Sequence, residues 1–150
     1  MFHGNVSLEI AEGLKRLRTR IDAAKIPASK LDETLNIATW NIRELGRKRR
    51  SDAAIHYIAE IIGQFDLVGI VELRRNLSDL NRILPILGPY WDAVYSDAII
   101  DDGGNEERIC YVFDSRTVRF NGMAAEASPP RKKRGHEYIS DESWWRAPYV

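Results

Sequence analysis

Two stretches of this sequence decide its fold: LNIATWNIR at residues 35–43 and FDLVGIVELR at residues 65–74. Each is an apolar run of strand length that ends at a polar residue, Asn41 in the first and Glu72 in the second. The segment between them has the length of one helix, so the pattern predicts a strand–helix–strand unit. Such a unit makes its two strands parallel and brings their carboxyl ends to one edge of the sheet. We therefore expect Asn41 and Glu72 to lie together.

The composition bounds the class of protein. The 150 residues suffice for one domain, and 22 Lys and Arg balance 22 Asp and Glu, so the total charge does not indicate a polyanionic partner. Cys110 is the single cysteine, which excludes an internal disulfide and favours a reducing compartment. No segment has the apolar length of a membrane span, and residues 7–25 are amphipathic where a signal peptide would be apolar. The sequence predicts a cytoplasmic protein without a membrane span.

Periodicity predicts the remaining elements. Residues 1–34 form an N-terminal extension with an amphipathic helix capped by Ser7, and residues 35–150 form the main domain. Ser51 is expected to cap the second helix and Gly63 to close it in a left-handed conformation, and Ser78 is expected to cap the third. The expected strands are 67–73, 91–95, 108–114 and 117–121, the last two as a hairpin; the expected helices are 7–25, 51–62 and 79–87; and 122–145 is expected to be a long loop.

Four segments, in this order, resemble motifs of the endonuclease/exonuclease/phosphatase superfamily, in its deoxyribonuclease-like branch. The likeness covers residues 35–150, and it departs from the usual pattern at Val71, where the family has Gln. The four segments are Thr39–Ile42, Val71–Leu73, Glu106–Phe113 and Trp145–Pro148.

The resemblance implies a role for each motif residue. Glu72 corresponds to the family's principal metal ligand, and Asn41 helps to hold both the metal and the substrate phosphate. Glu107 has the position of a Glu that orients a catalytic His, and Arg146 has that of an Arg that contacts substrate phosphate. The implied cofactor is Mg²⁺, with Mn²⁺ as the alternative, and the implied activity is metal-dependent phosphodiester hydrolysis.

The family's second half has no counterpart here. An Asp-x-Asn pair, a further Asp and a terminal Asp-His would follow Val150. The resemblance thus implies the N-terminal portion of a larger domain: an α/β fold that is the first half of a two-sheet β-sandwich with outer helices, preceded by the amphipathic helix. We expect little catalysis from this chain alone, and oligomers or aggregation through the sheet face that such a half leaves exposed.

Each residue also has a simpler interpretation. Asn41 is a turn former, Glu72 an ion-pair partner of Arg43 or Arg74, Glu107 half of an exposed pair with Arg108, and Arg146 a cation stacked on tryptophan. The three histidines do not have the spacing of metal ligands.

Two basic runs, Arg47–Arg50 and Arg131–Arg134, are either solvated segments or contacts for a polyanion. The second run favours nucleic acid, with DNA first, over lipid or a small phosphate ester as substrate. An alternative of another class is a non-catalytic fragment that binds nucleic acid or a protein through Arg131–Arg134.

Overall fold

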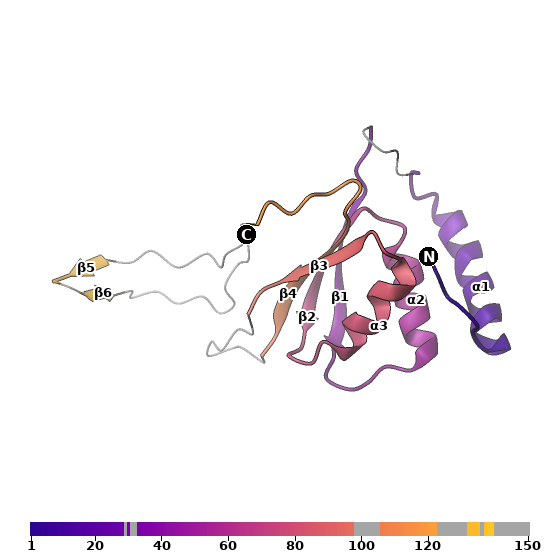
Figure 1. Ribbon diagram of the computed structural model, residues 1–150, viewed down its shortest axis with the longest axis horizontal. Coiled ribbons are helices and arrows are strands. Elements are labelled where there is room, and N and C mark those ends of the chain that lie inside the picture. Colours follow the sequence, from indigo (N-terminus) through magenta and orange to yellow (C-terminus); the bar gives the residue numbers. More distant parts are fainter. Residues whose placement is uncertain (29, 31–32, 98–105, 123–131, 136, 140–150) are drawn as a thin grey trace.

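The computed structural model describes residues 1–28, 30, 33–97, 106–122, 132–135 and 137–139. These residues form an α/β fold in which three helices lie on one side of a four-stranded mixed sheet, beside a separate two-stranded hairpin (Figure 1). The elements are α1 (Leu8–Ala24), β1 (Ile37–Leu45), α2 (Asp52–Ile62), β2 (Leu67–Leu73), α3 (Ser78–Leu87), β3 (Trp91–Tyr95), β4 (Arg108–Asp114), β5 (Lys132–Arg134) and β6 (Glu137–Ile139).

Side chains of the expected type begin the first two helices. Ser7 Oγ accepts from the backbone N–H of Ile10 before α1, and Ser51 Oγ accepts from that of Ala54 before α2. These bonds satisfy amide groups that a helix start leaves without intrahelical partners. Both caps were predicted, and both are confirmed.

Two predicted helix ends were wrong. Gly63 has a φ of −66°, not a left-handed value, because hydrogen-bonded turns continue past α2 to Phe65. Ser78 is the first residue of α3 and not its cap, since its backbone N–H is bound at 2.9 Å by the side-chain oxygen of Asn76. The N-cap position is Leu77, one residue earlier than expected, and it makes no side-chain capping hydrogen bond.

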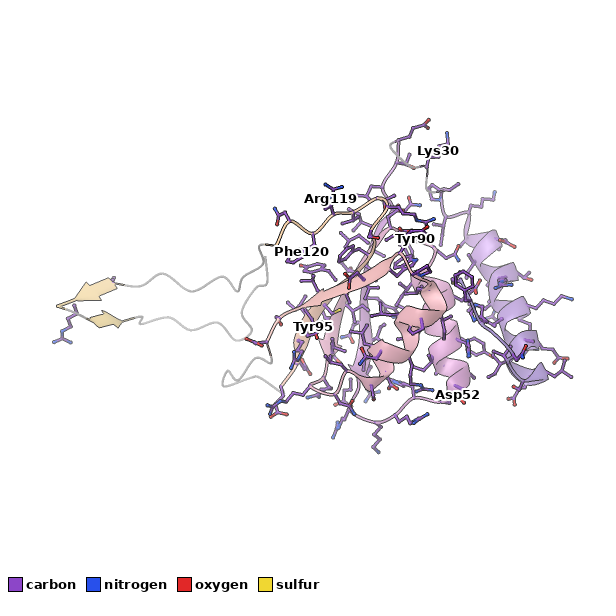
Figure 2. All side chains as sticks on the ribbon, in the orientation of Figure 1. Lys30, Asp52, Tyr90, Tyr95, Arg119 and Phe120 are labelled. Carbon is purple, nitrogen blue, oxygen red and sulfur yellow. The ribbon has the colours of Figure 1, made fainter. Side chains whose placement is uncertain are left out.

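The sheet has the order β1–β2–β4–β3. β1 and β2 are parallel, as the strand–helix–strand pattern predicted, while β4 runs antiparallel to both β2 and β3. As a result, the carboxyl ends of β1, β2 and β3 and the amino end of β4 lie at one edge, which we call the carboxyl edge. Figure 2 labels Tyr90, which directly precedes β3, and Tyr95, the last residue of β3, which lies at the carboxyl edge.

The expected hairpin strand at residues 117–121 is absent from the described residues. Both sides of β4 are already paired, with β2 on one and β3 on the other, so a returning strand finds no free edge. The chain instead turns away after Asp114, whose carbonyl accepts from the N–H groups of Thr117 and Val118. The short strands β5 and β6 replace part of the loop predicted over 122–145, with Gly135 at a φ of +64° in the turn between them.

The hydrophobic core lies between the helices and one face of the sheet, where apolar side chains of α2 and α3 cover β1, β2 and β4. β2 lies in the interior of the sheet, between β1 and β4. The fully buried members include Leu45, Ile62, Ile70, Leu73, Ile83, Cys110 and Val112. The α/β class is thus confirmed, whereas the two-sheet sandwich stays a prediction.

Candidate functional site

Asn41 and Glu72 meet at the carboxyl edge, as their positions at the ends of parallel strands predicted. The side-chain amide of Asn41 donates a hydrogen bond of 2.7 Å to Glu72 Oε1. The backbone N–H of Glu44 donates to the other oxygen, Oε2, at 3.2 Å. Two donors from β1 therefore fix the orientation of one carboxylate on β2.

The strand ladder is irregular at this pair. Asn41 is aligned with Val71 and Leu45 with Leu73, so the three residues 42–44 of β1 lie opposite the single residue Glu72. We call residues 42–44 the β1 bulge. Glu44 and Glu72 have φ values of +51° and +64°, a conformation that costs non-glycine residues roughly 1–3 kcal/mol. Buried Leu45 and Leu73, which follow them, hold this geometry in place.

Glu107 and Arg74 add an ion pair to the same edge. Glu107 precedes β4 and is only 7% exposed, so its interpretation as half of an exposed pair with Arg108 was wrong. Arg74 follows β2, and its Nη2 lies 3.5 Å from Glu107 Oε1 and 2.8 Å from Glu44 Oε1. The arginine thus links a carboxylate on β1 with one that lies just before β4.

These side chains line one surface cleft of about 520 Å³, which we call the edge cleft. Its lining contains three glutamates and three arginines, so the formal charges balance. Arg47 hydrogen-bonds to Glu44 and, with a smaller contribution from Arg74, holds the pKa of the Glu44 carboxyl below its usual value, although burial opposes this shift. The lining residues are Asn41, Arg43, Glu44, Arg47, Glu72, Arg74 and Glu107.

Three of the four predicted site residues, Asn41, Glu72 and Glu107, therefore share one cleft, and the fourth, Arg146, lies outside the described residues. The participation of Glu44 was not predicted, and Arg74 was considered only as a partner of Glu72. The β1 bulge turns Glu44 toward β2, and strand alternation without a bulge would not place it there.

The donors in the edge cleft fit a magnesium site of the usual kind. Mg²⁺ takes oxygen ligands, keeps several waters and needs only one or two protein carboxylates. Glu72 supplies a carboxylate and Asn41 a neutral carbonyl oxygen. Within the part of the chain that the structure describes, no group of three His, Cys, Asp or Glu side chains is arranged to hold a metal, so a larger protein ligand set is not present there.

No protein-family model matches the chain, and no curated protein matches it. The fold and the edge cleft define the chain as an α/β protein with a polar site at the carboxyl edge of a mixed sheet. None of the described helices combines the length and the apolar character that a transmembrane segment requires.

Proposed function

We propose that this chain carries the metal- and phosphate-binding part of a Mg²⁺-dependent phosphodiester hydrolase of the nuclease type, with Mn²⁺ as an alternative cation. The observation that supports this most is the meeting of Asn41 and Glu72 at 2.7 Å, at the place where the β1 bulge and two positive φ values interrupt the ladder. Strained backbone is concentrated at functional sites, which favours a functional over a structural origin for this geometry.

The residues of the edge cleft match the chemical demands of the reaction. Hydrolysis of a phosphodiester requires charge neutralisation on the phosphate, an activated water and support for the leaving oxygen. Mg²⁺, when bound, supplies charge neutralisation. Arg43 is exposed in the cleft lining and forms no ion pair with any described residue, so its guanidinium is available for a phosphate oxygen.

Glu72 and Asn41 have separate roles in this proposal. Glu72 binds the cation, and the neutral amide of Asn41 orients both the carboxylate and the phosphate without adding negative charge beside an anionic substrate. Glu107 supports Arg74 and is proposed to orient a catalytic histidine; the described lining of the edge cleft contains none. Arg146 is proposed as a further phosphate contact. The two-sheet sandwich and a cytoplasmic location belong to the same proposal.

A metal titration tests this proposal without requiring turnover. Mg²⁺ is expected to raise the melting temperature of the wild-type chain, whereas Glu72→Gln is expected to remove that effect, because binding to the folded state alone stabilises it. Glu106→Gln is the matched control, since Glu106 is exposed, pairs with Arg75 and lies outside the cleft lining. A Mg²⁺ response that Glu72→Gln leaves intact would refute the metal assignment.

A plasmid assay then measures catalysis. We expect little or no cleavage by the wild-type chain with Mg²⁺. Cleavage that disappears in Glu72→Ala would show that this chain suffices for turnover and would contradict the predicted inactivity.

The alternative of a non-catalytic binding fragment rests on β5, where Lys132 and Arg134 are both exposed, while Arg131 lies outside the described residues. It predicts salt-sensitive binding of nucleic acid that requires Lys132 and Arg134 and does not respond to Glu72→Gln.

A further inference from the structure

A second surface pocket adjoins the edge cleft and is far more basic. It has a volume of about 630 Å³ and shares Arg43, Glu44 and Arg47 with the edge cleft. It adds Lys48, Arg49 and Arg50 from the connection between β1 and α2, so one carboxylate faces five cations. We call residues 47–50 the basic loop.

The basic loop is held in place at both ends. At its start, Gly46 has a φ of +91° and packs so closely that an added Cβ would lie 2.1 Å from the carbonyl oxygen of Asn76. At its end, the N–H of Arg50 donates to Asp79 Oδ2 at 3.0 Å, and Arg82 donates to the carbonyl of Arg50 at 2.9 Å. Asp79 is fully buried, so the loop is anchored to the body of the domain.

The cations of the basic loop differ in how they are engaged. Arg47 pairs with Glu44, and the guanidinium of Arg50 donates to the carbonyl of Arg43. Lys48 and Arg49 are exposed, and neither forms an ion pair with any residue that the structure describes. An anchored loop that presents unpaired cations beside a candidate phosphate site has the charge arrangement expected of a contact for further phosphates.

We propose that Lys48 and Arg49 bind backbone phosphates of a nucleic-acid strand whose scissile phosphodiester lies in the edge cleft. This inference rests on the proposed function and specifies its substrate class. A small phosphate ester has no further phosphate to occupy the basic pocket. Binding to a lipid surface is strengthened by exposed apolar side chains beside the cations, but Ala54 is the one apolar residue in the described lining of the two pockets, which favours nucleic acid.

Equilibrium binding of labelled single- and double-stranded oligonucleotides, followed by fluorescence anisotropy in EDTA, tests the inference in the absence of cleavage. Lys48→Glu/Arg49→Glu is expected to weaken binding by about tenfold or more at low salt and to lower the salt slope by roughly two. The neutral variant Lys48→Gln/Arg49→Gln is expected to show a smaller loss in the same direction.

The matched control is Lys15→Glu/Arg20→Glu, which makes the same change of charge on exposed positions of α1. Figure 1 shows α1 on the outer side of α2, away from the connection that carries the basic loop. This control is expected to bind within about twofold of wild type at the same salt concentration. Equal losses in the two charge-reversal variants, or no loss in Lys48→Glu/Arg49→Glu, would overturn the inference.

Two further arms separate this inference from the proposed function. Glu72→Gln is expected to lose the Mg²⁺ response and to keep oligonucleotide binding. Failure of the wild-type chain to bind oligonucleotides, with a Glu72-dependent Mg²⁺ response intact, overturns the substrate class alone. Binding to phosphatidylserine vesicles that exceeds oligonucleotide binding and requires Lys48 and Arg49 also overturns it.

Discussion

The amide group of Asn41 donates to the carboxylate of Glu72 across the parallel pair β1 and β2, at a distance of 2.7 Å. A neutral side chain therefore occupies the position nearest to a carboxylate that also accepts from the Glu44 backbone. Replacement of this neutral group by a charged one is expected to change both the free energy of unfolding and the stabilisation that a bound cation provides.

Asn41→Asp is expected to lower the free energy of unfolding by about 1–2 kcal/mol without a divalent cation, because it removes a hydrogen bond and places two carboxylates together. Mg²⁺ is expected to stabilise this variant more than it stabilises wild type. Urea denaturation with and without Mg²⁺ measures both effects. Asn5→Asp, at an exposed position in the N-terminal segment, is the control, and an equal Mg²⁺ response in the two variants would contradict the assignment.

Arg74→Ala is expected to destabilise the fold by about 3 kcal/mol, since it leaves buried Glu107 without the guanidinium 3.5 Å away. Adding Glu107→Gln should restore part of the loss by removing the buried charge. Arg75→Ala provides a matched comparison, because the neighbouring Arg75–Glu106 pair is exposed on both sides and is expected to contribute less than about 1 kcal/mol. Similar losses in the two arginine variants, measured by urea denaturation, would be inconsistent with this prediction.

Acid is expected to weaken the packing of the N-terminal segment against α2. Burial, and secondarily the nearby His3, lower the pKa of His56 below its ordinary value of 6.5. The unfolded chain therefore binds a proton at a higher pH than the folded chain does, so stability is complete above pH 6.5 and declines as the pH falls from there toward the folded-state pKa. The Nδ1 atoms of His3 and His56 lie 2.9 Å apart, so a single proton can lie between these two nitrogens.

Urea midpoints of wild type and His56→Gln, compared between about pH 7.5 and about pH 5.5, measure this effect above the range in which carboxylates titrate. The substitution is expected to remove part of the decline. An unchanged pH dependence in His56→Gln would exclude this histidine as a source.

Gly13→Ala is expected to destabilise the docking of α1 on α2 by about 1 kcal/mol, although the same change usually stabilises a helix interior. An added Cβ would lie 1.7 Å from the hydroxyl oxygen of Tyr57, so the ring must move. In a Tyr57→Ala background the same substitution should instead stabilise by up to about 1 kcal/mol. Thermal unfolding of the four proteins in this cycle tests the prediction, and the same sign in both backgrounds would refute it.

The parts of the fold that local pattern controls were predicted from the sequence. The alternation and apolar runs of β1 and β2, with the serine-capped helix between them, predicted a parallel pair and so the meeting of Asn41 and Glu72. The failures arose where long-range pairing decides the outcome. Residues 117–121 have a strand-like pattern, but β4 is already paired with β2 and β3.

Within the candidate site, the meeting of Asn41 and Glu72 was predicted, and the roles of the site residues stay predictions. Asn41, Glu72 and Glu107 were chosen from the strand ends and the order of the motifs. The contact of Glu44 with the Glu72 carboxylate depends on the β1 bulge, and no residue of the sequence up to Gly46 indicates that bulge. Helix caps showed a similar limit: Ser78 is a good capping residue, but the N-cap position of α3 is Leu77, which makes no side-chain capping hydrogen bond.

The β1 bulge has a consequence for self-association as well as for the site. β1 is an edge strand, paired with β2 alone among the described strands, and a regular edge is a template on which another chain can extend the sheet. An interrupted ladder cannot be continued by a straight incoming strand beyond Asn41, so intermolecular pairing is confined to the first five residues of β1, where Ile37 is 59% exposed. The irregularity that orients the Glu72 carboxylate would therefore also keep neighbouring molecules from extending the sheet beyond Asn41.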